Sequence, residues 1–292
     1  MRYERHPVTQ TWRRATRQSV MRLLWYGAAG FGLLFIFVPV LWAVASSFRP
    51  LEEIFRDVSP FSLRAFVPSQ PTLEAYRAIF AKGYGRALFN SLYVTTITIG
   101  LGILVNSMAG FVFAKLIFPF QRLVFVVVLL ASMIPFEAIA IPLYALAQGL
   151  NWLDSYTVLI VPALANGLVV FLFRQFFAEI PTELIEAALI DGASWWRIYS
   201  RIFLPLSKPA IISGALILFL FQWNAFLWPL VAAPKKQYHV IQVAIANLQI
   251  EYQVLWNEQF AASFIGAVIP VAIVLCFQRY YIRGIAGTGL KG

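Results

Sequence analysis

The sequence predicts an all-α integral membrane protein with six transmembrane helices, and three observations carry that prediction. Of the 292 residues, 60% are hydrophobic and only 12% are charged, against about 45–50% and about 25% in soluble globular chains. The hydrophobic residues come in long blocks, which is typical of membrane spans. The alternating apolar and polar residues of a membrane β-strand are absent, so helices are expected to satisfy the backbone inside the lipid.

Six hydrophobic segments are long enough for a helix to cross a hydrocarbon core of about 30 Å. We expect them at about 22–47, 88–113, 123–147, 156–177, 210–232 and 261–282. The first follows a basic start and includes Ala43-Val44-Ala45, which fits the pattern of a signal-peptide cleavage site. Because the apolar run that ends there exceeds the roughly 7–15 residues of a signal sequence, we interpret it as an uncleaved first span.

The distribution of Lys and Arg predicts that both termini lie in the cytoplasm. With the N-terminus inside, the cytoplasmic segments hold fifteen of the 23 Lys and Arg residues and the outer loops hold eight. This excess agrees with the positive-inside rule. The outer loop 48–87 alone carries six of those eight, which weakens the contrast. The expected organisation is a basic cytoplasmic tail 1–21, a six-helix transmembrane domain 22–282 that includes a cytoplasmic loop 178–209, and a cytoplasmic tail 283–292.

The composition also excludes several classes of function. A net charge of +10 suggests nucleic-acid binding, but the clearest basic cluster directly precedes the first apolar run, where Lys and Arg usually hold the cytoplasmic side of a span. A single cysteine, Cys276, permits neither an internal disulfide nor a cysteine-based metal site. The only histidines, His6 and His239, lie outside the spans, so no catalytic pair or metal cluster can form there. We predict a non-enzyme without a metal, a bound cofactor or nucleic acid.

The longest polar interruption, 178–209, predicts a compact helix-turn-helix on the cytoplasmic side. Pro181 suits the first position of a helix, and Glu186 lies in an early turn near the positive end of the helix dipole. Gly192 can adopt a left-handed C-cap, and Ser194 can cap a second short helix. The apolar residues that share one face of the first helix are Leu184, Ile185, Ala188 and Leu189. Two interpretations stay open: a hairpin that only anchors the spans, or a docking surface for a cytoplasmic partner.

This loop resembles the signature of ABC-importer permeases. Glu186-Ala187-Ala188, then Gly192 after three further residues, then Ile202-Phe203-Leu204-Pro205 after nine more, match the pattern EAA---G---------I-LP without a departure. The residues that the resemblance implies for coupling to an ATPase are Glu186, Ala187, Ala188, Asp191, Gly192, Ile202, Leu204 and Pro205.

Other stretches resemble the carbohydrate-uptake branch of these permeases. Residues 223–230 and the terminal residues 284–292 are similar to the maltose type, and 171–177 is similar to the glycerol-3-phosphate type. The resemblance implies the type I importer architecture in a bacterial inner membrane. It implies a second homologous permease subunit, two cytoplasmic ATPase subunits that use ATP and Mg, and an extracytoplasmic solute-binding protein. In agreement, the chain contains no G-x-x-x-x-G-K-[ST] motif, so another polypeptide is expected to bind ATP.

Four residues inside the predicted spans are candidates for the substrate path. Glu137 lies between two prolines of the third span; an intramembrane acid usually faces a cavity or a partner, or else relieves a proline-broken backbone. Gln222 and Asn224 flank Trp223, and amides beside a ring suit a sugar, whose hydroxyls need hydrogen bonds and whose faces stack on aromatics. The alternative is that these amides join helices to one another.

The remaining intramembrane residues bear on packing and on the solute. Asn90, Asn106 and Asn166 are interpreted as helix-packing amides, and Trp152, Trp228 and Tyr144 as aromatics of the membrane interface. A sugar or oligosaccharide is favoured as the solute over glycerol-3-phosphate or another polyol or phosphodiester. A phosphate needs a buried Arg or Lys, and none lies nearer the centre of the spans than Arg174, at the cytoplasmic end of the fourth.

Overall fold

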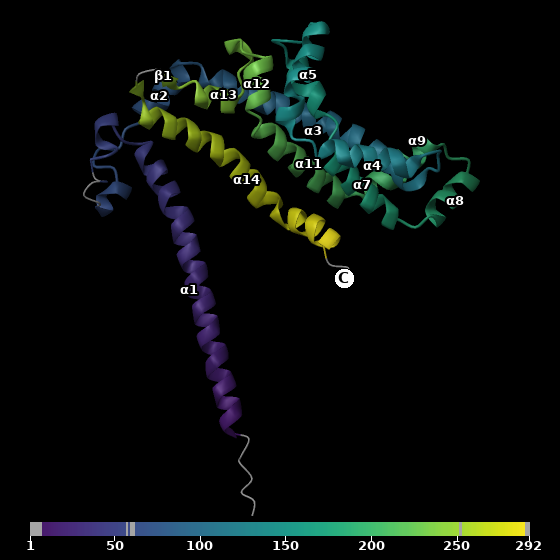
Figure 1. The fold of residues 1–292 in the computed structure, drawn as a ribbon, viewed down its shortest axis with the longest axis horizontal. Coiled ribbons are helices and arrows are strands. Elements are labelled where there is room, and N and C mark those ends of the chain that lie inside the picture. The colour runs from purple at the N-terminus through teal and green to yellow at the C-terminus, as the bar shows by residue number, and fades with distance from the viewer. Residues whose placement is uncertain (1–7, 57, 59–61, 251–252, 290–292) are drawn as a thin grey trace, which may run out of the picture. The chain divides into compact units, whose positions relative to one another are not determined.

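The computed structural model describes residues 8–56, 58, 62–250 and 253–289, and the described chain is mostly helical (Figure 1). The α-helices are α1 Val8–Ser46, α2 Glu74–Ala81, α3 Tyr84–Lys115, α4 Gln121–Ser132, α5 Phe136–Gly149, α6 Tyr156–Ile160, α7 Gly167–Glu179, α8 Glu183–Ile190, α9 Trp195–Ile198, α10 Leu204–Leu206, α11 Lys208–Trp223, α12 Leu227–Ala232, α13 Ile241–Ala246 and α14 Trp256–Gly289. The other elements are the 3-10 turns η1 Leu51–Glu53, η2 Leu63–Phe66, η3 Val161–Ala163 and η5 Lys236–Tyr238, the π-helix η4 Tyr199–Phe203, and the antiparallel pair β1 Gln249–Ile250 and β2 Gln253–Val254.

Three helices are long and apolar enough to cross a membrane alone: Met21–Ser46, Tyr84–Lys115 and Trp256–Gln278. They match the first, second and sixth predicted spans. The first and last helices also continue into the predicted tails, of which residues 1–7 and 290–292 lie outside the described part of the chain. By length and composition the described residues hold three spans, or up to six when bent pairs of helices are joined.

The other predicted spans are broken helices where the sequence predicted continuous ones. The third consists of α4 and α5, which meet at 99°, and the fourth of Tyr156–Ala163 and Gly167–Glu179, which meet at 43°. The fifth consists of α11 and α12, separated by residues 224–226. A further bend of 83° lies where Trp195–Leu206 leads into α11.

Two local features explain the bends in the third and fourth spans. Pro135 precedes α5, and a proline lacks the N–H that would continue α4 and disfavours helix at the residue before it. At the other break, Asn106 of α3 donates to the carbonyl of Leu164 and accepts from the backbone N–H of Asn166, both at 2.8 Å. Asn166 in turn caps α7 by accepting from the N–H of Val169 at 3.2 Å. The interpretation of Asn106 as a packing amide is confirmed, whereas the side chain of Asn166 caps its own helix.

Asn90 also packs as predicted. Its amide nitrogen donates to the carbonyls of Gln237 and His239, each at 2.9 Å, and its oxygen accepts from the Tyr156 hydroxyl at 2.8 Å. Asn90 is fully buried, so these three bonds satisfy its polar atoms. One side chain thereby holds α3, α6 and the loop after α12 together.

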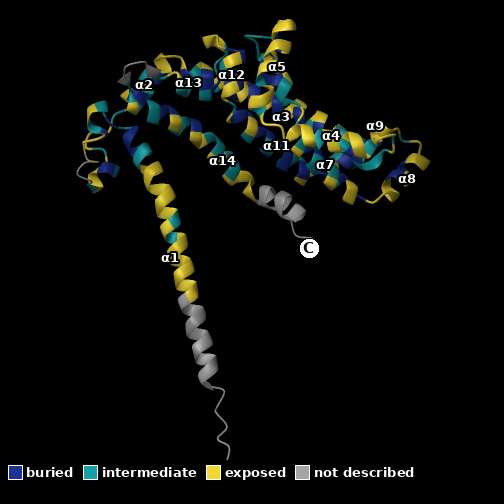
Figure 2. Ribbon diagram, viewed as in Figure 1, coloured by how far each residue is buried: buried dark blue, intermediate teal, exposed yellow. Residues whose placement is uncertain are grey.

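Contacts group the chain into two compact units: residues 1–77 with 255–264, and residues 78–254 with 265–292. In the first unit, buried Arg49 donates to the carbonyls of Glu53, Arg64 and Val67 and so fixes the loop that follows α1. Most of the hydrophobic stretch of α1 is exposed, and only 6% of it is buried (Figure 2). The surface of this helix therefore suits lipid or a partner subunit.

The second unit has a core in which α3 packs against α7 and α11. Glycines permit the close approach of these helices, as small residues commonly do in membranes. A Cβ atom at Gly110 of α3 would lie 2.5 Å from the Cβ of Phe173 and 2.9 Å from the backbone nitrogen of Arg174 on α7. A Cβ at Gly102 would lie 2.9 Å from a methyl of Leu218 on α11. No side chain fits at Gly110 without moving α7.

Replacing Gly110 with Ala is therefore expected to destabilise the protein by about 1–3 kcal/mol, because the added methyl overpacks the contact between α3 and α7. The matched control is Gly100→Ala in the same helix, where a Cβ meets nothing within 4 Å. There the change is expected to be neutral or to stabilise by up to about 1 kcal/mol, since Ala favours helix over Gly. The unfolding midpoints of the two purified variants in detergent measure these effects. Equal midpoints for Gly110→Ala and Gly100→Ala would show that the contact between α3 and α7 is not closely packed.

Candidate functional site

The predicted helix-turn-helix at 178–209 is present in the structure. The first helix, α8, is followed by Gly192 in the left-handed region at φ +73°, as predicted. Ser194 then caps α9 by accepting from the N–H of Arg197 at 3.4 Å. Pro181 lies two residues before the first residue of α8 rather than at its first position. The helix begins later because the Thr182 carbonyl accepts the first helical hydrogen bonds.

The predicted single apolar face of α8 is divided between two environments. Ile185 and Ala188 are buried in the core of the second unit. Leu184 and Leu189 are 41% and 44% exposed, and Ile190 is 87% exposed. Leu184 and Leu189 flank the buried pair on the helix, and Ile190 projects from another side. All three apolar side chains are accessible to a partner.

The second half of the motif forms an unusual turn. Ile202 and Phe203 lie in the π-helix η4, and Leu204 and Pro205 follow in α10. A proline has no N–H and its ring crowds the carbonyl four residues earlier, which accounts for a widened turn directly before it. Ile202 and Leu204 pack against the buried core, while Pro205 is exposed.

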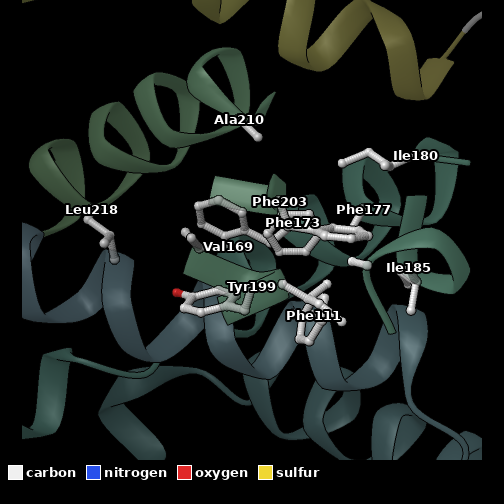
Figure 3. Packing of buried hydrophobic residues seen from close by; sticks show 12 residues of the cluster. Phe111, Val169, Phe173, Phe177, Ile180, Ile185, Tyr199, Phe203, Ala210 and Leu218 are labelled. Atoms are coloured by element: carbon white, nitrogen blue, oxygen red, sulfur yellow. The ribbon is translucent and has the colours of Figure 1, made fainter. Parts of the chain in front are cut away.

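An aromatic cluster joins this loop to α3 (Figure 3). The ring of Phe111 on α3 lies 4.9 Å from Phe203, 5.5 Å from Tyr199 and 6.0 Å from Phe177, centroid to centroid. These distances are those of attractive edge-to-face and tilted ring pairs. Phe111 therefore contacts rings in the second half of the loop and the ring of Phe177, which directly precedes the loop.

Two polar contacts hold the same loop against α3. The hydroxyls of Ser107 and Tyr199 lie 2.8 Å apart, and both residues are buried. The Lys115 ammonium donates to the carbonyl of Ile180 at 2.6 Å and lies 5.8 Å from the centre of the Phe203 ring. Sequence reasoning missed both contacts, because single hydroxyls and one Lys at a helix end carry no recognisable pattern.

Three of the four candidate substrate-path residues line one cavity of about 690 Å³ in the second unit. Glu137 comes from the first turn of α5, just after the bend from α4. Gln222 lies near the end of α11, and Asn224 lies in the break that follows. The helix breaks therefore bring together side chains that lie far apart in the sequence.

The cavity has two further features that sequence reasoning missed. Thr98 of α3 is 1% exposed, and its hydroxyl has no hydrogen-bond partner among the described residues. Aromatic side chains, Phe136 and Trp228 among them, form part of the wall. Glu137 is the only ionisable residue among the lining residues, which include no Arg, Lys or His.

The fourth candidate, Trp223, does not line this cavity. It is 1% exposed, stacks on Phe219 at 5.5 Å and donates its indole N–H to the carbonyl of Gly266 at 3.0 Å. Trp228, which the sequence placed among the aromatics of the membrane interface, is 8% exposed and donates its indole N–H to the carbonyl of Val158 at 2.7 Å. The aromatic residues that line the cavity together with the amides are Phe136, Phe221, Phe226 and Trp228.

Broken apolar helices around a largely apolar cavity with a few polar groups, together with an exposed helix-turn-helix, are features of a membrane transport subunit. Residues 86–285 match the model of the family described as binding-protein-dependent transport system inner membrane component. The arabinooligosaccharides transport system permease protein AraQ of Halalkalibacterium halodurans is 33% identical over 96% of this chain and 100% of its own length. The sn-glycerol-3-phosphate transport system permease protein UgpE of Rhizobium meliloti is 30% identical over 88% of this chain and 93% of its own length.

A solved structure agrees in fold. The crystal structure of a bacterial ABC transporter involved in the import of the acidic polysaccharide alginate superposes with a TM-score of 0.79 at 17% identity, covering 91% of this chain and 97% of that one. The chain belongs to the family of binding-protein-dependent transport system inner membrane components. It is a non-catalytic permease subunit with the type I importer fold.

Proposed function

We propose that this chain forms half of the translocation pathway of an ATP-driven importer for a sugar or oligosaccharide. The cavity lined by Glu137, Gln222 and Asn224 carries the proposal, because carboxylate and amide groups converge there beside aromatic walls. Its volume of about 690 Å³ lies within the roughly 300–1,000 Å³ typical of small-molecule sites. The likeness to an arabinooligosaccharide permease adds support for an oligosaccharide.

A glycerol-3-phosphate solute is the second candidate, favoured by the likeness to the UgpE permease. The charges of the cavity argue against it. A phosphate would meet the Glu137 carboxylate and no cationic side chain of this chain, whereas phosphate sites use Arg or Lys. A neutral solute needs no such charge.

Uptake by cells that carry the complete importer tests the choice of solute. Labelled arabino-oligosaccharide should accumulate, and excess unlabelled oligosaccharide should compete while glycerol-3-phosphate should not. Uptake of labelled glycerol-3-phosphate that the oligosaccharide leaves unchanged would show that the phosphorylated solute is the right one.

In the proposed complex, a second homologous permease completes the pathway, two cytoplasmic ATPases hydrolyse ATP with Mg, and a solute-binding protein delivers the cargo. The exposed residues Leu184, Leu189 and Ile190 of α8 would enter a groove on the ATPase. The residues of this loop that match the permease signature, from Glu186 to Gly192 and from Ile202 to Pro205, would set its shape. Closure of the ATPases would then displace the loop and switch the cavity between outward and inward access.

Helix α3 provides a physical route between the loop and the cavity. Near its end, Ser107, Phe111 and Lys115 contact the loop. Earlier in the same helix, Thr98 lines the cavity and Asn106 holds the break before α7. A displacement of the loop would therefore reach the cavity through one continuous helix.

The proposed orientation has both termini and the α8 loop in the bacterial cytoplasm. Two exposed positions, Gln148 and Thr182, suit cysteine labelling in a Cys276→Ala background. Gln148→Cys is expected to react with an impermeant thiol reagent added to whole cells, and Thr182→Cys only after lysis. The reverse pattern would overturn the orientation, and with it the docking of the loop to a cytoplasmic ATPase.

A further inference from the structure

A second, smaller cavity of about 400 Å³ lies where α3 ends and α4 begins. It belongs to the second unit and is separate from the proposed substrate cavity, with which it shares no lining residue. The residues that line it are Phe113, Ala114, Gln121, Arg122, Phe125, Val126 and Arg174. Two of these seven are arginines and none is acidic, so the cavity is strongly cationic.

The two guanidinium groups are not neutralised by the described part of the chain. No carboxylate there forms a salt bridge with Arg122 or Arg174. Arg174 is fixed in place, because its guanidinium carbon lies 4.4 Å from the centre of the Phe125 ring, a cation–π distance. Gln121 is also fixed, since its amide nitrogen donates to the carbonyl of Phe113 at 2.9 Å. Two cations that face one cavity repel each other, and an anion between them removes that cost.

The surroundings of the cavity are those of a membrane surface. The loop between α3 and α4 exposes two large apolar residues, Ile117 at 99% and Phe120 at 77%. The adjoining helix α4 exposes Leu123, Val127 and Leu130 at 62%, 54% and 58%. Apolar side chains beside Arg residues are typical of the boundary between lipid head groups and acyl chains.

We propose that this cavity binds the phosphate group of an anionic phospholipid, whose acyl chains lie along the exposed apolar residues of α4. Guanidinium groups bind phosphate oxygens in pairs of parallel hydrogen bonds, and basic pockets between membrane helices bind anionic head groups. The same phosphate chemistry describes free inorganic phosphate, but the exposed apolar face of α4 favours the lipid. The proposal requires the membrane placement of the chain and is independent of the solute it carries.

Native mass spectrometry of the complete importer complex, with phosphatidylglycerol or phosphatidylcholine added, tests this site. Phosphatidylglycerol is expected to stay bound at higher occupancy than phosphatidylcholine. In Arg122→Gln and in Arg122→Gln/Arg174→Gln, the affinity for phosphatidylglycerol should fall by about tenfold or more, because charge-assisted hydrogen bonds are lost. The control is Arg86→Gln, an exposed position in the first turn of α3 outside the cavity, which should retain the lipid.

The single variant keeps the test decisive if the double variant does not assemble, since Arg122 is exposed. Equal retention of phosphatidylglycerol by the wild type and Arg122→Gln would overturn the proposal. Equal retention of phosphatidylcholine and phosphatidylglycerol by the wild type would also overturn it. Displacement of the bound lipid by millimolar inorganic phosphate would show a free-phosphate site instead. None of these readouts depends on transport, so they separate this site from the proposed function.

Discussion

Replacement of Gly192 with Val is expected to abolish the coupling of ATP hydrolysis to transport while leaving the helices folded. Gly192 has φ +73°, a conformation that costs other residues about 1–2 kcal/mol and a β-branched residue more. A Cβ there meets nothing within 4 Å, so the effect is one of backbone conformation and not of crowding. The turn between α8 and α9 would change, and Glu186 would no longer be presented as in the native loop.

The measurement is ATP hydrolysis by the reconstituted complex with and without its loaded solute-binding protein. Stimulation by that protein should fall by about tenfold or more in Gly192→Val. The matched control is Gly192→Asn, because Asn tolerates the left-handed conformation and should keep most of the stimulation. If Gly192→Val assembles and is stimulated like the wild type, the loop is an anchor and not a coupling element.

The second large effect is expected in the cavity that Glu137, Gln222 and Asn224 line. Replacing Glu137 with Ala removes the only ionisable group that lines it. For a hydroxylated solute, the loss of hydrogen bonds to a carboxylate is expected to lower the rate of uptake at limiting solute by about tenfold or more. Stimulation of ATP hydrolysis by the binding protein should persist, since the α8 loop is untouched. Uptake and ATP hydrolysis measured on the same proteoliposomes separate a defect in the substrate path from a defect in coupling.

Two variants control this experiment. Glu137→Gln keeps an acceptor oxygen and the shape of the side chain, so it should retain more uptake than Glu137→Ala. Glu74→Ala removes an exposed carboxylate from the first turn of α2, outside the cavity, and should behave like the wild type. Wild-type uptake by Glu137→Ala would remove this carboxylate from the substrate path.

The sequence predicted the helical class of the fold and the approximate position of its hydrophobic segments, because the constraint is one of length and polarity. The described residues hold three unbroken spans, or up to six when bent pairs are joined. It also predicted the left-handed turn at Gly192, since a glycine between an amphipathic helix and a capping serine has few other uses. It did not predict the 99° bend between α4 and α5. Pro135 marks the break, but the packing of α5 against other elements sets the angle.

The side chains of the cavity illustrate the same limit. Gln222, Trp223 and Asn224 were grouped because they are adjacent, but α11 ends at Trp223 and the chain turns. Trp223 then points into the packing around Gly266, while its two neighbours line the cavity. Thr98 gave no signal, because one hydroxyl in an apolar helix commonly bonds to its own backbone. Which residues converge depends on tertiary packing.

Site-specific photocrosslinking tests the proposed contact between the α8 loop and an ATPase directly. A photoreactive residue at Ile190, which is 87% exposed, should form an adduct with the ATPase subunit in the complete complex, and the yield should change when ATP is added. The same residue at Leu150, at the end of α5, should form no such adduct. An ATPase adduct from Leu150 and none from Ile190 would contradict the account.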